Sequence, residues 1–192
     1  AATAAFGALQ RAAEFDQLTQ SVEFFGNAAG RNLDLVVNKL IEVTDGALSA
    51  EGAFRGTALA ISSGFNTEQL ERLTGVAKGA STALGRDLND AFDRLVRGAA
   101  KLEPEILDEL GIMVRLDDAV QDYASQLGRA VTSLSAFEKR QAFLNAINEK
   151  GTQQFGDLAA AVDVNPFNQL SASLNNLAKA GVGVLNLVLV PV

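Results

Sequence analysis

The sequence predicts an all-α protein, a series of amphipathic helices that is partly extended and has coiled-coil-like packing between helices. Helix-forming residues such as Ala, Leu, Gln and Glu are plentiful, whereas β-branched and aromatic runs are scarce. Apolar residues recur at three- and four-residue steps along most of the chain, which is the helical period. With 192 residues, 48% of them hydrophobic, the chain can bury one substantial core or several stripes against partner copies.

Residues 1–43 form the first predicted segment and contain two amphipathic helices. The apolar stripe of the first helix consists of Phe15, Leu18, Val22 and Phe25. The stripe of the second, which follows Gly30, consists of Leu33, Val36, Val37, Leu40 and Ile41. The pair Asp45-Gly46 breaks this periodicity and therefore predicts a turn.

Residues 44–112 form the second segment, a multi-helix module whose first helix begins at Ser49 and ends at Gly64. Ser49 is a favourable N-cap, and Gly64 is free to adopt the left-handed conformation that ends a helix. Small residues fall four apart along this helix and therefore share one face. We expect them to allow a second helix to approach closely; they are Gly52, Gly56, Ala60 and Gly64.

Further helix signals follow in the same module. Asn66 and Gln69 have the spacing of a capping box, so they predict the start of a helix that Gly85 interrupts. The next helix is expected to end before Pro104, because proline disfavours helical geometry in the residue before it. Pro104 then opens a short helix, which Gly111 is expected to end in a Schellman motif.

Residues 113–164 form the third segment, which carries a heptad-like stripe that we call the seam. Its apolar residues alternate in steps of four and three and are Leu116, Val120, Tyr123, Leu127, Leu134, Phe137 and Leu144. Gly128 and the capping-box pair Ser135 and Glu138 weaken its continuity, so two antiparallel helices are an alternative. We expect the seam to be the main helix contact, either between copies or within one folded-back chain.

Residues 165–192 form the last segment, a helix followed by an apolar tail. Asn165 and Pro166 predict the cap and first turn, and the stripe that follows is Phe167, Leu170, Leu174 and Leu177. Residues 180–192 carry no charged side chain. This tail is shorter than the about 20 apolar residues that a bilayer-spanning helix needs.

Composition argues against several functions. The net charge of −7, with no run of basic residues, argues against sequence-specific nucleic-acid binding. The chain has no Cys, His or Trp, so it lacks thiolate nucleophiles, imidazole bases and the usual zinc ligands. We therefore expect neither an enzyme nor a cofactor or metal site.

The densest group of carboxylates could in principle serve acid–base chemistry or bind a hard cation. It consists of Glu103, Glu105, Asp108 and Glu109, with Asp117 and Asp118 close behind. A structural explanation is favoured, because acidic residues in the first turns of short helices complement the helix dipole. No EF-hand pattern or aromatic sugar platform accompanies them.

Three stretches of the chain resemble bacteriophage tail tape measure proteins. The run TDGALSAEGAFRGTALAISSGFNTEQLERLTGVAKGASTALGRDLNDAFDRLVRG, from Thr44 to Gly98, looks like a helical module found in many of them. KLEPEILDELGI (Lys101 to Ile112) and SLSAFEKRQAFLNAINEKGTQQFG (Ser133 to Gly156) resemble the segments that follow. The resemblance extends from Thr44 to Leu177 and includes no catalytic signature.

The resemblance implies a structural virion protein that sets tail length during tail assembly. Such a protein occupies the lumen of the tail tube or the tail tip and leaves with the DNA at genome ejection. Its implied partners are three or six copies of itself, the tail tube protein, distal tail and baseplate hub proteins, and a tail assembly chaperone. Contact with the host inner membrane is also implied, and the chain would be a fragment of a longer protein.

The alternative is a membrane-active helical module that forms a conduit for DNA through the host envelope. The apolar tail and the small-residue stripe of residues 52–64 motivate it. Charged neighbours of the small residues, such as Glu51 and Arg55, would be costly in lipid and favour close packing of helices in water.

A ruler works because an α-helix rises about 1.5 Å per residue, so that residue number becomes length. One continuous helix of this chain would reach at most about 290 Å. However, 17 glycines, several caps and two X-Pro stops make one continuous rod improbable. The sequence therefore predicts a folded or interrupted part of the protein, nearer the tail tip than the plain ruler.

Overall fold

The computed structural model describes residues 20 and 33–161, and over these residues the chain is helical without a strand. The expected all-α class is thereby confirmed for this part of the chain. The predicted stripe of residues 15–25, the predicted helix of residues 165–177 and the apolar tail lie outside the described residues.

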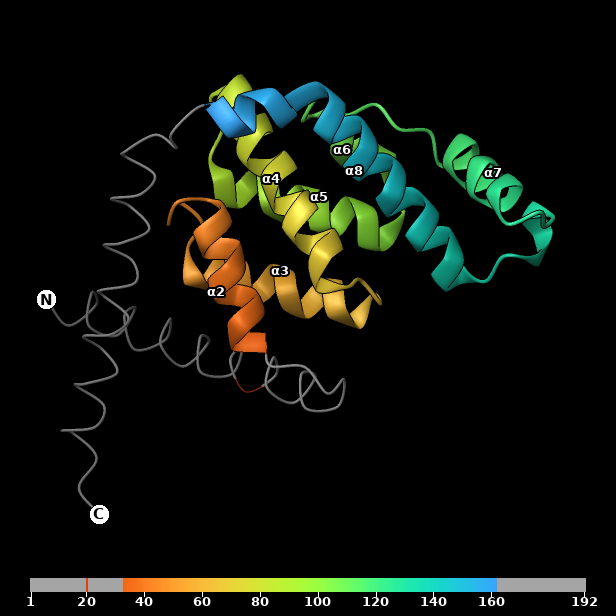
Figure 1. Ribbon diagram of the computed structural model, residues 1–192, viewed down its shortest axis with the longest axis horizontal. Helices are drawn as coiled ribbons and strands as arrows, with labels where there is room; N and C mark the ends of the chain where they lie inside the picture. The colour runs from red at the N-terminus through yellow and green to blue at the C-terminus, as the bar shows by residue number, and fades with distance from the viewer. Residues whose placement is uncertain (1–19, 21–32, 162–192) are drawn as a thin grey trace, which may run out of the picture.

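Seven α-helices and one 3₁₀ turn make up the described part (Figure 1). In chain order they are α2 (Leu33–Val43), α3 (Ala50–Ser62), α4 (Thr67–Leu84), α5 (Leu88–Lys101), α6 (Pro104–Asp108), α7 (Leu116–Gln126), η1 (Val131–Ser133) and α8 (Ala136–Ala161). The longest of them, α8, has 26 residues.

The helix starts follow the local signals in the sequence. The Ser49 side chain accepts a hydrogen bond from the Gly52 amide and caps α3. Asn66 and Gln69 form both bonds of the capping box at the start of α4. Pro104 occupies the first turn of α6. These three predicted starts are confirmed, because each depends on contacts within about four residues.

Most helix ends also match expectation. Gly64 and Gly85 have φ values of +87° and +63° and end α3 and α4. After α6, the amide of Ile112 donates to the carbonyl of Leu107 at 3.2 Å, and Gly111 has φ +70°, as the predicted Schellman motif requires. One end differs, because α5 is capped by Leu102 in the left-handed conformation, which is uncommon for a residue with a side chain.

One hydrophobic core joins helices from all three predicted segments that the structure describes. Its largest fully buried side chains include Phe65, Phe92 and Phe143. Buried residues of α2 to α5 contribute to it, and so do Phe143, Leu144 and Ile147 of α8. Within the described residues, the predicted boundaries at 43/44 and 112/113 therefore do not separate independent packing units.

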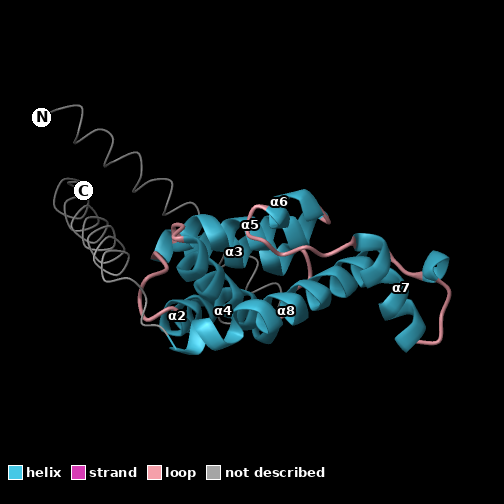
Figure 2. Cartoon of the chain, turned by 90° about the horizontal axis from the view of Figure 1, so that it is seen from above, coloured by secondary structure: helices cyan, strands magenta, loops and turns pink. Residues whose placement is uncertain are grey.

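The most extensive helix contact in this part of the chain is between α4 and α8. These helices run in the same direction, because Gln69 meets Gln141, Val76 meets Gly151 and Gly79 meets Phe155. Figure 2 shows α8 extending from the bundle of α2 to α6 toward α7, which lies at the far end. The chain thus forms a bundle with an arm at one end, made by α7, η1 and the start of α8.

Candidate functional site

The seam residues do not form one continuous face. Leu116, Val120, Tyr123 and Leu134 pack around a small second core at the arm, together with Ala124 and Ala142. Leu144 is fully buried in the main core instead. Leu127 and Phe137 are 46% and 48% exposed. The seam therefore divides between two cores and the surface.

The local reason is a chain reversal after α7. Gly128 adopts a left-handed conformation with φ +63°, and the Arg129 amide donates to the Ala124 carbonyl at 2.9 Å. Ser135 and Glu138 then form the predicted capping box and start α8. Two helices that fold back on each other, the alternative left open by the sequence, replace one continuous helix. The α4–α8 contact, rather than the seam, is the main helix contact of the described chain.

The small residues of α3 lie against side chains of other helices. A Cβ atom on Gly56 would overlap the ring of Phe92, and one on Gly52 would lie 2.6 Å from Oδ1 of Asn89. Both partners belong to α5, and Ala60 is fully buried in the same core. Gly64, beyond the end of α3, lies beneath the ring of Phe137. The stripe thus accommodates α5 along α3 and an aromatic ring at its end.

The start of α4 is joined to α8 by hydrogen bonds between side-chain amides. Nε2 of Gln69 donates to Oε1 of Gln141 at 2.6 Å and lies 3.4 Å from Oδ1 of Asn145. Nε2 of Gln141 donates to the carbonyl of Gly64 at 3.0 Å. Nδ2 of Asn148 donates to the carbonyl of Gln69 at 3.3 Å. We call these four side chains the amide cluster, and it fixes the register of α8 against α4.

Glycines allow the rest of this interface to be close. A Cβ atom on Gly79 of α4 would lie 2.7 Å from both the Cβ and the carbonyl oxygen of Phe155. A Cβ atom on Gly151 of α8 would press into the side chain of Val76, 2.8 Å from its Cγ2. Contacts below 3.0 Å essentially do not occur, so any larger residue at these two positions would push the helices apart.

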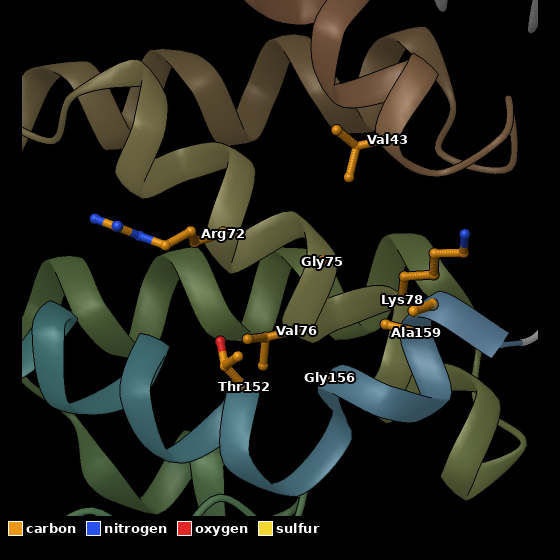
Figure 3. A pocket seen from close by; sticks show the side chains of 9 residues that line it. Val43, Arg72, Gly75, Val76, Lys78, Thr152, Gly156 and Ala159 are labelled. Atoms are coloured by element: carbon orange, nitrogen blue, oxygen red, sulfur yellow. The ribbon is translucent and has the colours of Figure 1, made fainter.

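An open groove of about 300 Å³ lies beside this interface (Figure 3). It is lined by the end of α2 and by one face each of α4 and α8: Val43, Arg72, Gly75, Val76, Lys78, Thr152, Gly156, Ala159 and Ala160. Most of these side chains are small or apolar. Outside the backbone of α4 itself, no atom of the described residues lies within 4 Å of the position that a Cβ on Gly75 would take.

The two cations of the groove already have carboxylate partners. Nζ of Lys78 lies 2.7 Å from Oδ2 of Asp45, and Nη1 of Arg72 lies 3.1 Å from Oε1 of Glu68. Both cations are therefore already engaged in ion pairs with carboxylates. The groove is suited to apolar side chains rather than to acid–base chemistry.

Charged residues close the turn of the arm. The amide and hydroxyl of Ser135 donate to Oε2 of Glu138 at 2.7 and 2.8 Å. The guanidinium of Arg129 pairs with the other carboxylate oxygen. The hydrogen bonds from Ser135, and to a smaller extent the interaction with Arg129, hold the pKa of Glu138 below its ordinary value. Glu138 thus acts as a structural carboxylate of the turn.

One member of the acidic cluster around α6, Glu109, forms ion pairs. Glu109 pairs with Arg94 at 2.8 Å and lies 3.6 Å from Arg86, which joins α6 to α5. Among residues 20 and 33–161, no group of three or more acidic side chains is placed to hold a metal ion. Glu105 of α6 and Asp117 and Asp118 of α7 lie in first turns, as the helix-dipole explanation expects, whereas Glu109 lies at the C-terminal end of α6.

The local sequence pattern does not predict the amide cluster. In the sequence, Gln69 indicates only a capping box, and Gln141 lies between Phe137 and Leu144 of the seam. Asn148 is only 4% exposed and lies among apolar residues, and such a buried polar side chain usually has a partner. Its partner is a backbone carbonyl 79 residues earlier, so no local pattern could reveal it.

No protein family matches the chain, and no solved structure is similar to it. Within the described residues, none of the helices is both long enough and apolar enough to cross a bilayer.

Asn148 offers a test of the amide cluster, because its Oδ1 is buried and accepts no hydrogen bond from the described residues. Replacing Asn148 with leucine is expected to leave stability unchanged or to raise it by up to about 1 kcal/mol, since a half-satisfied amide is removed. Replacing it with aspartate is expected to cost about 2 kcal/mol or more at pH 7, because a carboxylate cannot donate to the Gln69 carbonyl.

Urea unfolding of the full chain at several pH values measures both effects. Burial raises the folded-state pKa of the introduced carboxyl, so the cost should be present at neutral pH and shrink as pH falls through that pKa. Gln153→Leu and Gln153→Asp, at an exposed position of the same helix, are the matched controls. A large loss of stability in Asn148→Leu would mean that the cluster stabilises the bundle instead of setting its register.

Proposed function

We propose that this chain is a structural component of a bacteriophage tail and belongs to a tape measure protein. The observation that carries the proposal is the resemblance that extends from Thr44 to Leu177. It is a likeness of long sequence stretches, in a chain that contains neither Cys nor His.

The arrangement of the three resembling stretches supports the proposal. The first supplies α3, α4 and most of α5, the second supplies α6, and the third supplies most of α8. All three contribute to the main core: Phe92, Leu107 and Phe143 are examples from the first, second and third stretch. The three resembling stretches therefore belong to one packed unit. This is expected if the chain has a whole folded module, rather than separate helices, in common with tape measure proteins.

A folded unit has a definite consequence for tail length. Residues 33–161 would span about 190 Å as a single helix, whereas the longest helix in the bundle spans about 39 Å. The described residues would thus add little to a ruler. We propose that they form a compact unit near the tail tip, where the tail tube, distal tail and baseplate hub proteins meet several copies of the chain.

Purified tails provide the first test. The chain should be present in them, and antibodies against the described residues, or averaged electron cryomicroscopy density, should place it on the tail axis toward the tip. A tail assembly chaperone should be bound before assembly and absent afterwards. Absence of the chain from purified tails, or its location on the outer wall, would refute the proposal.

Tail length provides the second test. An in-frame deletion of residues 33–161 should either stop tail assembly or shorten tails by much less than about 190 Å. A wild-type copy supplied in trans should restore normal tails. Tails that are viable and shorter by the full helical length would show that this part acts as an extended ruler, contrary to the compact unit proposed here.

The conduit alternative gains no support from the described residues. The small-residue stripe that motivated it is occupied by α5, through Asn89 and Phe92. The apolar tail, its other motivation, lies outside the described residues. Binding of the whole chain to vesicles, with no copies in purified tails, would favour this alternative.

A further inference from the structure

The groove beside the α4–α8 interface lies where the described chain ends. Ala159 and Ala160 line the groove, and the description stops one residue later, at Ala161 in the last turn of α8. Thirty-one further residues follow in the sequence. The segment that follows Ala161 therefore starts at the edge of the groove.

We propose that residues 166–177 fold back onto the same molecule and place their apolar stripe in this groove. The occupant is the predicted helix that begins at Pro166 and carries Phe167, Leu170, Leu174 and Leu177 on one face. The inference concerns contacts within one chain and does not depend on the proposed function.

The connection is long enough for such a reversal. Residues 162–165 separate α8 from the predicted helix, and four extended residues reach about 13 to 14 Å. Packed helices lie about 8 to 10 Å apart, so this linker spans the distance with some length to spare. The proline that follows disfavours helical geometry at Asn165, which promotes a break in the chain there.

The dimensions of the groove and of the stripe agree. Along α8 the groove extends from Thr152 to Ala160, which is about 12 Å of helix. From Phe167 to Leu174 the stripe covers about 11 Å. In an antiparallel arrangement, Phe167 would lie near Ala160 and Leu174 near Thr152. The space beside Gly75, where no described atom outside the α4 backbone lies within 4 Å, is open to receive one of the apolar side chains.

Charge and connectivity favour this segment over the one at the other end of the chain. Residues 164–178 carry no charge, which suits an apolar groove whose cations are already paired. The segment 15–25, in contrast, includes two charged residues, Asp16 and Glu23, between the apolar positions of its stripe. Moreover, the N-terminal segment precedes α2, which begins at Leu33, whereas the α2 residue that lines the groove is Val43 at the opposite end of that helix. The N-terminal segment therefore joins the described chain at the end of α2 that is farther from the groove.

Cysteine cross-linking in the intact chain tests the proposal without background, because the protein has no cysteine. Ala159→Cys is combined with Leu170→Cys on the stripe or, as the control, with Ala172→Cys off the stripe. Under mild oxidation of dilute protein, we expect the stripe pair to form an intramolecular disulfide at least about tenfold faster than the control pair. Disulfide formation requires Cα atoms within about 7 Å, so the difference in rate reports placement.

A variant that fills the groove gives an independent readout. Gly75→Leu should leave the bundle folded, because the site is open and leucine favours helix more than glycine does. It should slow the Leu170→Cys cross-link about tenfold or more and remove hydrogen-exchange protection from residues 166–177, because one apolar side chain loses its place. Ala83→Leu, at an exposed position of the same helix, should change neither measurement.

The results separate the possible occupants. A disulfide-linked dimer from the stripe pair, without the intramolecular product, would show that a second copy covers the groove and would overturn the proposal. Equal rates for both pairs, or unchanged protection in a folded Gly75→Leu variant, would overturn it as well. Faster intramolecular cross-linking on the stripe together with loss of protection in Gly75→Leu would establish it.

Discussion

Replacing Phe92 with alanine is expected to lower the free energy of unfolding by about 3 to 5 kcal/mol, because it empties the centre of the main core. Phe92 is 1% exposed, and its ring lies directly over Gly56 of α3. The effect is a large share of the about 5 to 15 kcal/mol that stabilises a typical domain. Urea unfolding of the full chain, followed by circular dichroism, measures it.

The effects of substitutions at Gly56 and Phe92 on the free energy of unfolding should be strongly coupled. In the native protein, Gly56→Ala is expected to cost about 1 to 3 kcal/mol, because the added Cβ overlaps the Phe92 ring. In the Phe92→Ala background that ring is gone, and the same change should instead stabilise the protein by up to about 1 kcal/mol through helix propensity. A double-mutant cycle isolates this change of sign.

Met113→Ala is the matched control, since Met113 is 74% exposed and the change should stay within about 0.5 kcal/mol. A cost for Gly56→Ala that is the same in both backgrounds would show that α3 and α5 are not held together by this contact.

Features that depend on a few neighbouring residues could be predicted from the sequence. The caps at Ser49 and Asn66 and the stop at Gly111 were predicted, because their hydrogen bonds span three to five residues. The left-handed Leu102 was not, since helix capping usually selects glycine there. Its conformation is adopted between α5 and α6, where Gly98 lies against Leu107.

Features that depend on long-range pairing could not be predicted in the same way. Periodicity shows which face of a helix is apolar, but it does not name the helix that covers this face. The parallel pairing of α4 with α8 joins residues more than 70 positions apart, as in the bond from Gln69 to Gln141. The seam shows the same limit. Its apolar spacing continues across the turn after α7, although the chain reverses direction there.

Because of this reversal, we expect substitutions of Leu127 and Leu134 to have different effects on stability, although both residues belong to the predicted seam. Leu134 is 6% exposed and packs with Val120, Ala124 and Ala142 in the small core of the arm, whereas Leu127 is 46% exposed. Leu127→Asp should therefore change stability by no more than about 0.5 kcal/mol. Leu134→Asp places a carboxylate without a partner in an apolar site, at a cost of several kcal/mol.

A core of only four buried residues is not expected to withstand that cost, so Leu134→Asp should unfold the arm while the bundle remains folded. Among the described elements, α7 has extensive contacts only with α8 and η1. It contributes one buried residue, Ala119, to the main core, so most of that core should remain when α7 detaches. Hydrogen exchange measures the result: amides of α7 should lose their protection in Leu134→Asp, whereas those of α4 and α5 keep theirs. Leu127→Asp should resemble the native chain throughout. Equal loss of protection in the two variants, or loss in α4 and α5 as well, would show that the arm and the bundle unfold as one cooperative unit and that the residues of the seam act together after all.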